Sequence, residues 1–265
     1  MTVPVLHAQA VSCRLGNRLI LDQVDLAAHA GTLTCLLGPN GAGKSTLLRA
    51  LAGDLALSTG AVSFGDRPLS DWPATALARR RAVMTQKPAT AFDFSSLEVV
   101  LLGRHPHCAG RPGRRDTELA HRALGLAEAT HLSDRSITTL SGGEAARVHF
   151  ARVLAQAAFE EDGTPHALLL DEPTASLDLS HQHALMRTAR KLAHERGLAV
   201  VAVVHDLNLA ARYADRAVLL AAGRVKASGT PADVLRPEHV ATCFGIEVVQ
   251  VTPAGHDVPL LLVTD

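Results

Sequence analysis

Aromatic side chains are scarce in this 265-residue chain, which has six Phe, one Trp and one Tyr, or 3% of its residues. The chain also lacks an excess of charge of either sign, because 26 Lys and Arg stand against 26 Asp and Glu. Proteins that hold a nucleic-acid backbone normally carry a basic excess, and those that bind single strands add aromatic stacking surfaces. The composition therefore excludes both classes, and we expect no nucleic-acid partner.

Long apolar runs are missing as well. Residues 198–204 form one of the longest, far short of the roughly 18–20 residues needed to cross a bilayer. The opening residues Met-Thr-Val-Pro offer neither the basic nor the apolar segment of a secretory signal. We expect no membrane span and a chain that stays on the cytosolic side.

Cysteines are few, and none has Cys-x-x-Cys spacing, which favours free thiols in a reducing compartment over a metal site or disulfides. The four are Cys13, Cys35, Cys108 and Cys243. What the chain does have is apolar content, since 47% of its residues are hydrophobic and 20% are charged. This is enough to bury a full core, and the length predicts one large α/β domain over 1–265 with room for an insert.

Short apolar runs alternate with turn residues near the N-terminus. Residues 3–15 and 18–26 are predicted to be strands on either side of a turn at Gly16 and Asn17. Two strands joined by so short a turn run antiparallel. The first part of the chain is therefore expected to contain an antiparallel pair.

From about residue 86 to 158 helical periodicity dominates and strands disappear. Residues 103–113 interrupt this pattern, because they are too rich in Gly and Pro for regular structure. We predict an inserted helical subdomain over approximately 87–158 with an internal loop. Strands and helices then alternate, as a doubly wound parallel sheet requires. The predicted elements are strands at 168–170, 198–204 and 218–221, and helices at 181–195 and from 207 onward.

The segment between a predicted buried strand at 32–37 and a predicted helix at 47–52 matches the phosphate-loop pattern Gly-x4-Gly-Lys-Ser in full. Its glycines let the backbone fold closely around an anion, so that N–H groups and the helix N-terminus face the phosphates. Lys44 supplies a positive charge and Ser45 a hydroxyl for Mg²⁺. The predicted ATP-binding residues are Gly38, Pro39, Asn40, Gly41, Ala42, Gly43, Lys44, Ser45 and Thr46.

Two carboxylates follow the apolar run 167–170. A buried strand that ends in Asp171 and Glu172 places both at the carboxyl edge of a sheet, beside the glycine loop. Asp171 is suited to hold Mg²⁺, and Glu172 to orient or deprotonate an attacking water. A simple Asp-Glu-Pro turn is the alternative, which the nearby phosphate loop makes weaker.

The string Leu-Ser-Gly-Gly-Glu at 140–144 precedes an amphipathic run. Ser141 and Glu144 have the spacing of a capping box, so the string predicts a helix start. A helix N-terminus also attracts anions, and Gly142 and Gly143 would let a triphosphate approach the backbone.

Taken together, these motifs resemble the ATP-binding subunits of ABC transporters. The phosphate loop, the string at 140–144, the Asp171–Glu172 pair and a histidine at 205 follow in that family's order over nearly the whole chain. The resemblance implies a P-loop NTPase parallel sheet with helices on both faces, an antiparallel β subdomain at the N-terminus and an inserted α-helical subdomain. It also implies ATP and Mg²⁺ as cofactors and ATP hydrolysis coupled to transport.

The resemblance assigns further roles. Glu172 and His205 are the catalytic pair, and Gln86 joins Ser45 and Asp171 at the magnesium ion. The signature residues Ser141, Gly142, Gly143 and Glu144 contact the ATP of a partner subunit, and Ser176, Leu177 and Asp178 communicate across the dimer. The implied partners are a second copy of the chain in a head-to-tail dimer, two permease subunits and a substrate-binding protein. The implied location is the cytoplasmic face of the inner membrane, as a peripheral protein.

One departure from the family concerns the adenine. Many members stack it on an aromatic residue near the end of the first strand, where this chain has Arg14, Leu15 and Gly16. Stacking by Arg14 and packing by Leu15 are the two substitutes that the sequence offers, and we assign no adenine-contacting residue.

The cargo can be inferred only from closer resemblance. The string Gly-Arg-His-Pro-His at 103–107 is similar to importers of iron chelates, haem and cobalamin, and the string at 177–182 looks most like the haem (hemin) branch. A β extension at approximately 240–265 fits that branch too. Ferric siderophore or cobalamin import is the nearer alternative. A soluble, non-transport ABC ATPase is the more distant one, which the single motif set disfavours.

The paired histidines at 105/107 and 181/183 are expected to lie at a surface or interface rather than to bind metal or haem. Residues two apart face different sides of a helix, and no carboxylate or Cys completes a ligand set. The arginine run 79–81 is expected to be solvated charge.

Overall fold

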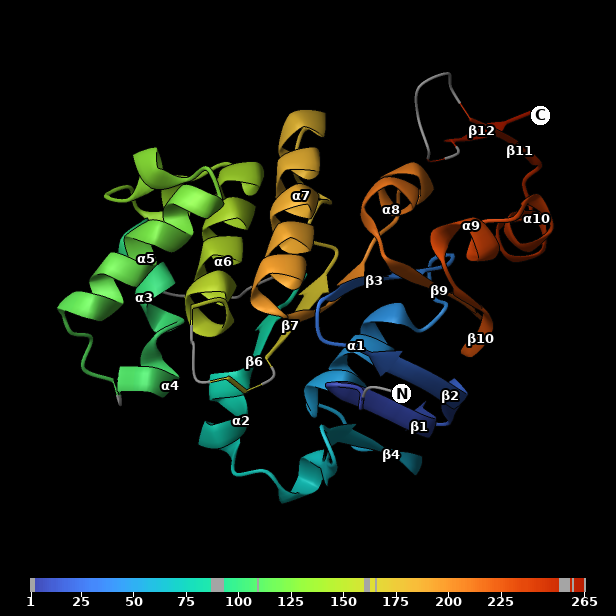
Figure 1. Ribbon diagram of the computed structural model, residues 1–265, viewed down its shortest axis with the longest axis horizontal. Coiled ribbons are helices and arrows are strands. Elements are labelled where there is room, and N and C mark those ends of the chain that lie inside the picture. Colours follow the sequence, from blue (N-terminus) through green and yellow to red (C-terminus); the bar gives the residue numbers. More distant parts are fainter. Residues whose placement is uncertain are drawn as a thin grey trace.

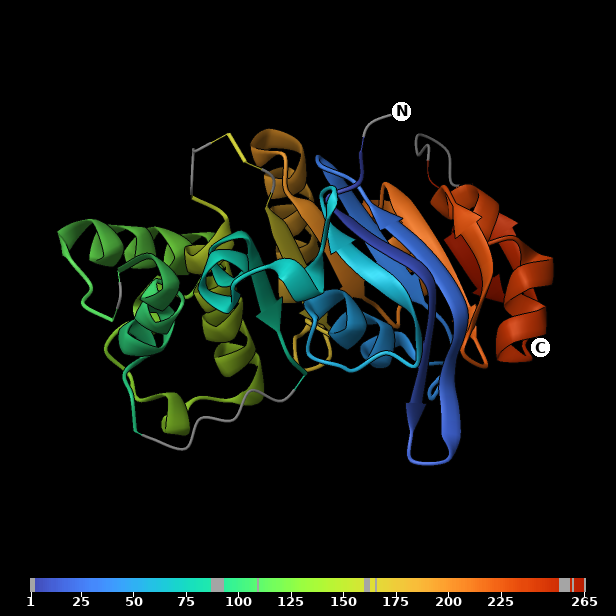
Figure 2. The same cartoon turned by 90° about the horizontal axis from the view of Figure 1, so that it is seen from below.

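The computed structural model describes residues 3–86, 93–108, 110–159, 163–164, 166–252, 258 and 260–264. Within them the chain is built in layers around a six-stranded sheet, with a helical region on one flank and the C-terminal elements on the other (Figures 1 and 2). No helix in the described part combines the length and apolarity that a membrane span requires.

The six-stranded sheet has the order β10-β9-β3-β8-β7-β6. Neighbours from β9 to β6 pair in parallel, and β10 adds an antiparallel edge. The inner strands are apolar runs with every residue buried in β7 and β8, which explains why they can lie between two covered faces. The strands are β3 (Thr32–Leu37), β6 (Arg81–Met84), β7 (Ala167–Asp171), β8 (Ala199–Val203), β9 (Arg216–Ala221) and β10 (Arg224–Gly229).

Side chains of this sheet alternate between two cores. Leu36, Leu169 and Val201 face helix α1 (Lys44–Ala52) and the second sheet. Cys35 and Leu168 face the opposite side, where three other helices lie. Those helices are α6 (Gly142–Ala157), α7 (Leu179–Arg196) and α8 (Leu207–Tyr213). The predicted parallel sheet with helices on both faces is therefore confirmed.

The second sheet is antiparallel where its strands pair, with the order β2-β1-β4-β5, and α1 lies between it and the first sheet (Figure 1). The predicted N-terminal pair is confirmed with slightly different ends. The short elements from β4 to α2 had no clear signal in the sequence. The bounds are β1 (Leu6–Leu15), β2 (Arg18–Ala28), β4 (Thr59–Phe64), β5 (Arg67–Pro68), η1 (Leu69–Asp71) and α2 (Ala74–Arg80).

The helical region packs α3 and α5 against α6, as expected for the insert. One expectation for it is wrong, because residues 105–108 of the Gly- and Pro-rich segment form a helical turn. That turn closes when the N–H groups of His107 and Cys108 donate to the carbonyl of Arg104. The elements are α3 (Ser96–Leu102), α4 (His105–Cys108), α5 (Arg114–Leu126), η2 (Thr130–Leu132) and η3 (Ile137–Thr139).

The C-terminal elements lie beside β9 and α8 (Figure 1). Two apolar strands pair antiparallel into a small separate sheet, as the sequence suggested. The elements are α9 (Pro231–Val234), α10 (Pro237–Phe244), β11 (Val248–Val251) and β12 (Leu260–Val263). The division of the chain into a subdomain at 87–158 and an extension at 240–265 stays a prediction.

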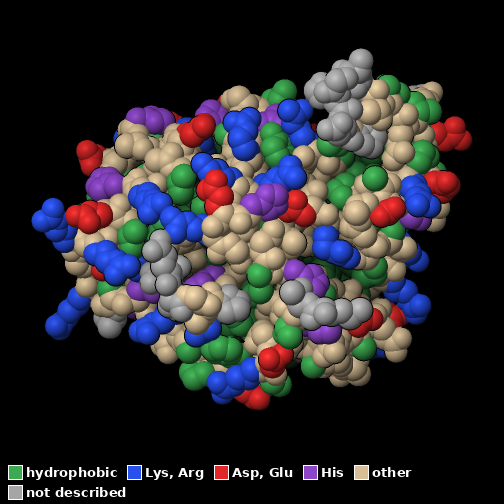
Figure 3. Space-filling model, in the orientation of Figure 1, with side chains coloured by type: hydrophobic (Ala, Val, Ile, Leu, Met, Phe, Trp, Pro, Cys, Tyr) green, Lys and Arg blue, Asp and Glu red, His purple; other side chains and the backbone are tan. Residues whose placement is uncertain are grey.

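Charges of both signs are interspersed over the face seen in Figure 3, and no single sign gathers over one element there. Basic and acidic side chains thus both lie on this face.

Candidate nucleotide site

The glycine loop connects the carboxyl end of β3 to the first turn of α1. Gly43 caps α1 with backbone alone, because no side chain accepts a hydrogen bond from the first turn. The N–H groups at such a helix start remain available to an external acceptor, and the helix dipole makes the position favourable for an anion. The local structure at 38–46 is thus the strand, loop and helix that the motif predicted.

Gly38 shows why the loop needs glycine. Its φ of 142° lies in the region that side chains disfavour, and a Cβ built there would stand 2.0 Å from the carbonyl oxygen of Leu220 in β9. The loop therefore passes directly against the neighbouring strand, with no room for any larger residue.

Lys44 turns back into the loop. Its Nζ donates to the carbonyl of Gly38 at 2.7 Å and to that of Pro39 at 2.9 Å, and only 6% of the residue is exposed. Burial lowers the pKa of this amine, while the negative charges of Glu172 and Asp171 act in the opposite direction. The ammonium group lies inside the curve where a phosphate would have to enter.

Asp171 ends β7 beside the start of α1. Its Oδ1 accepts a hydrogen bond from Ser45 Oγ at 2.9 Å, and only 8% of the residue is exposed. Burial raises the pKa of Asp171, more than the Ser45 hydrogen bond and Lys44 lower it. A buried carboxylate that its neighbours stabilise incompletely is a suitable ligand for a cation.

Glu172 is held on both oxygens. Gln86 Nε2 donates to its Oε2 at 2.6 Å, and His205 Nε2 lies 2.7 Å from its Oε1. The residue also has a φ of 49°, which is uncommon outside glycine and often marks a functional position. Gln86, predicted beside the magnesium residues, is therefore bonded to the predicted base, while Ser45 and Asp171 form a pair of their own.

The string at 140–144 forms the predicted capping box at the start of α6. Ser141 N donates to Glu144 Oε2 at 2.8 Å, and Glu144 N donates to Ser141 Oγ at 3.3 Å. Ser176 Oγ donates to the carbonyl of Gly142 at 3.2 Å. Asp178 caps α7 by accepting from His181 N at 2.9 Å. Ser176, the first of the residues predicted to communicate across a dimer, thus contacts the signature string of its own chain.

The structure does not bring the signature string to the glycine loop of the same chain. Among the described residues no hydrogen bond connects 141–144 with 38–46. Figures 1 and 2 show α6 in the helical region and α1 beneath the central sheet. The two motifs therefore lie in different parts of the same chain.

Arg135 is a site neighbour that the sequence did not reveal. Its Nη1 donates to Glu144 Oε1 at 2.9 Å, so it completes the partners of the capping carboxylate. A spacing of nine residues across a turn carries no helical or strand signal, and only the folded loop brings the two together.

The string at 103–107 has a structural role. Arg104 is 3% exposed, and it bonds to Asp116 Oδ1 at 3.1 Å and to the carbonyl of Ala155 at 2.7 Å. A Cβ on Gly103 would stand 2.1 Å from the carbonyl oxygen of Arg152, so this segment lies directly on α6. His107 Nε2 lies 2.9 Å from the carbonyl of Gln156. The string therefore joins α4 and α5 to α6.

The paired histidines have separate partners. His181 Nδ1 lies 2.8 Å from Asp178 Oδ1, and His183 Nδ1 lies 2.9 Å from the hydroxyl of Tyr213. Within the described residues no cluster of three or more His, Cys, Asp or Glu could hold a metal ion. The prediction that the arginine run 79–81 is solvated is wrong for Arg81, because its side chain is only 13% exposed.

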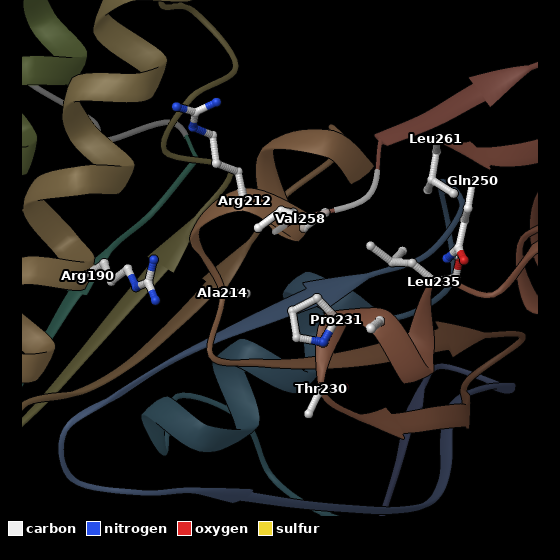
Figure 4. A pocket seen from close by; sticks show the side chains of 11 residues that line it. Arg190, Arg212, Ala214, Thr230, Pro231, Leu235, Gln250, Val258 and Leu261 are labelled. Atoms are coloured by element: carbon white, nitrogen blue, oxygen red, sulfur yellow. Dashed lines mark hydrogen bonds between the residues drawn. The ribbon is translucent and has the colours of Figure 1, made fainter. Parts of the chain in front are cut away.

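A cavity of about 220 Å³ lies between α7, α8, α9 and the C-terminal strands (Figure 4). Its described lining is largely apolar, with Arg190 on α7 and Arg212 on α8, and it contains none of the predicted site residues.

Comparison with known proteins agrees with this geometry. Residues 21–175 match the sequence pattern of the family described as ABC transporter. The chain is 48% identical over 258 residues to the "Hemin import ATP-binding protein HmuV" of Gloeobacter violaceus, covering 97% of this chain and 94% of that protein. It is 47% identical over 260 residues to the protein of the same name in Pseudomonas aeruginosa, covering 97% and 99%.

Solved structures give the same class. One, of an ABC transporter described as of the metal-chelate type, matches with a TM-score of 0.81 and 25% identity over 100% of this chain and 98% of that one. The ATP-binding cassette MJ1267 in its ADP conformation matches with a TM-score of 0.77 and 23% identity over 92% and 98%. The chain belongs to the ABC transporter family, and its fold is that of the ATP-binding cassette.

Proposed function

We propose that the chain is the ATP-binding and ATP-hydrolysing subunit of an importer that carries haem (hemin) across the inner membrane. The observation that carries this proposal is the shared edge of the sheet, where a glycine loop, two carboxylates, Gln86 and His205 converge. The near full-length relatives named for hemin import support the cargo.

In this proposal the triphosphate lies along 38–46. Lys44 would exchange its bonds to the loop carbonyls for the phosphate oxygens, an exchange in which one set of charge-assisted hydrogen bonds replaces another. The N–H groups of the loop and of the first turn of α1 would donate to the same oxygens.

Ser45 and Asp171 fit a magnesium ion, since both present hard oxygen atoms and lie 2.9 Å apart. Magnesium is typically held by one or two side chains together with phosphates and waters, so two protein ligands suffice. When bound, the ion would neutralise phosphate charge and relieve the cost of burying Asp171.

Glu172 would orient or deprotonate the attacking water. The oxygens that it needs for this are engaged by Gln86 and His205, so at least one of these bonds would open as the water takes its place. His205 would then be free to contact the terminal phosphate, as the family resemblance implies. Glu172 and His205 would thus both take part in turnover.

Because one chain separates its glycine loop from its signature string, we propose a head-to-tail dimer with ATP between 38–46 of one copy and 141–143 of the other. Ser176, Leu177 and Asp178 would lie at that interface. The helical subdomain at 87–158 would contact two permease subunits, and a substrate-binding protein would join through them. The chain would thus be a peripheral protein at the cytoplasmic face of the membrane.

The test is transport by proteoliposomes that hold the whole complex, with haem compared against a ferric siderophore and cobalamin. We expect ATP-dependent uptake of haem alone. The Glu172→Gln complex serves as the matched control, since it should bind ATP without sustained uptake.

ATP-dependent uptake of cobalamin or siderophore in place of haem would keep the ATPase assignment and replace the cargo. Full uptake by the Glu172→Gln complex would contradict the assigned catalytic role. A chain that hydrolyses ATP but does not associate with an integral-membrane subunit would favour the non-transport alternative.

A further inference from the structure

The signature string carries a charge that opposes its proposed ligand. Glu144 lies in the first turn of α6, where a carboxylate stabilises the helix because it faces the positive end of the dipole. The same position would face the triphosphate of the partner subunit, and two negative charges at close range repel. The structure contains an arrangement that answers this conflict.

Both oxygens of Glu144 are engaged. Oε2 accepts from the backbone N–H of Ser141 at 2.8 Å, and Oε1 accepts from Arg135 Nη1 at 2.9 Å. The hydrogen bonds to Ser141, helped by the charge of Arg135, hold the pKa of Glu144 below its ordinary value, so the carboxylate stays ionised. Among the described residues, no hydrogen bond uses the N–H groups of Gly142 and Gly143.

Hydrogen bonds hold both the backbone and the side chain of Arg135. Its carbonyl accepts from the backbone N–H of Ser96 at 2.9 Å and from Ser96 Oγ at 3.0 Å, and Ser96 is fully buried at the start of α3. Its Nη2 also donates to the carbonyl of Thr139 at 3.3 Å. The guanidinium is therefore directed at Glu144 from a fixed backbone, with 47% of its side chain exposed.

We propose that Arg135 is a positioning residue that neutralises Glu144, so that the signature string can accept the triphosphate of the partner subunit. Glu144 gives the helix start its shape, Arg135 cancels its charge, and the N–H groups of Gly142 and Gly143 remain for the phosphate. This inference rests on the head-to-tail dimer of the proposed function.

The experiment compares four full-length chains that all carry Glu172→Gln, which should hold the ATP-bound dimer. They are this parent and the variants Arg135→Met, Glu144→Gln and Arg135→Met/Glu144→Gln. Analytical ultracentrifugation measures the ATP concentration at which half of each chain is dimeric. Arg114→Met is the control for loss of one positive charge, because its pair with Glu118 on α5 is exposed.

If charge is the cause, the ATP concentration at half-dimerisation should rise with the net negative charge beside the signature string. Arg135→Met should raise the half-point about tenfold, and Glu144→Gln should lower it. The double variant should return to the parent value, because the site is again neutral. The defect of Arg135→Met should also shrink relative to the parent as salt is raised, since salt screens partly exposed charges.

If Arg135 only supports the local structure, the dimerisation measurements should give a different result. The double variant would then be as defective as Arg135→Met, in low and high salt alike, and that outcome overturns the inference while leaving the dimer in place. An unchanged half-point for Arg135→Met would overturn it too. Failure of the parent itself to dimerise with ATP would contradict the proposed dimer, and the inference with it.

Discussion

Glu172 occupies a backbone conformation that most residues avoid, with a φ of 49°, and its two oxygens are bonded to Gln86 and His205. Local strain at one residue persists only where the surrounding structure fixes it. The parallel sheet does so here, because β7 delivers Glu172 and β8 is followed by His205 at the same edge. The sequence placed both residues correctly, since carboxyl ends of parallel strands share an edge. It did not predict the Gln86 contact, because that requires the path of the chain after β6.

Replacement of Glu172 by Gln should separate binding from turnover. The amide keeps the size of the side chain but cannot take a proton from water, so the ATPase rate should fall at least about 100-fold. Nucleotide affinity should be retained, because Lys44 and the glycine loop are unchanged. Phosphate release measures the ATPase rate, and a calorimetric titration measures the nucleotide affinity. ATPase activity equal to the unmodified chain would refute the role given to Glu172.

Replacement of Lys44 by Ala should show the opposite pattern. The ammonium group lies against the loop carbonyls of Gly38 and Pro39, and its loss would remove the charge-assisted hydrogen bonds that we propose it makes to the phosphates. Nucleotide affinity itself should therefore fall by about tenfold or more. Isothermal titration of the full chain with ATP measures it, with Arg114→Met as a control for net charge. An unchanged affinity would count against the phosphate-loop assignment.

Asp171 gives a prediction about stability and pH. Burial raises the pKa of Asp171 above its ordinary value of 3.8, so at neutral pH the folded state bears a cost for keeping it ionised. That cost disappears below 3.8, where the unfolded chain is protonated as well. Asp171→Asn should therefore raise the Tm at pH 7, and the gain should shrink as the pH falls toward 4. A thermal melt at both pH values checks this; a lower Tm at pH 7 would contradict it.

At the scale of elements, the sequence predicted what depends on local pattern. The buried strand β8 is a continuous apolar run, β3 and β7 are largely apolar, and the capping box at Ser141 is a four-residue signal. The turn at α4 was missed because its Gly and Pro suggest irregular chain. Its shape depends on Arg104, whose partners Asp116 and Ala155 lie on other helices. No local pattern encodes a contact of that kind.

Arg104 should therefore matter for stability although it lies outside the candidate site. Its side chain is 4% exposed and that of Asp116 is 15% exposed. Arg104→Met would remove the donor to Asp116 Oδ1 and to the carbonyl of Ala155, while the N–H of Gly113 would still donate to Asp116 Oδ2. We expect a loss of about 2–3 kcal/mol in the free energy of unfolding, less than for a fully buried pair. Urea denaturation measures it. The exposed pair of Arg114 and Glu118 supplies the control, and Arg114→Met should change the midpoint little. Equal midpoints for the two variants would contradict the anchoring role of the 103–107 string.

At the scale of the whole molecule, the proposed dimer places the glycine loop of one copy beside the signature string of the other. Cross-linking can test this arrangement. Asn40 and Thr139 are exposed, and in a head-to-tail dimer residue 40 of one copy would approach residue 139 of the other. Both single-cysteine chains carry Glu172→Gln, and Cys108 and Cys243, which are only partly buried, are replaced by Ser. A mixture of Asn40→Cys and Thr139→Cys chains should form a covalent dimer with a short bis-maleimide when ATP is present. Neither chain should do so by itself, because in the proposed two-fold dimer residue 40 of one copy approaches residue 139 of the other, and not its own counterpart. Cross-linking of either chain alone, or none in the mixture with ATP, would rule out the proposed assembly.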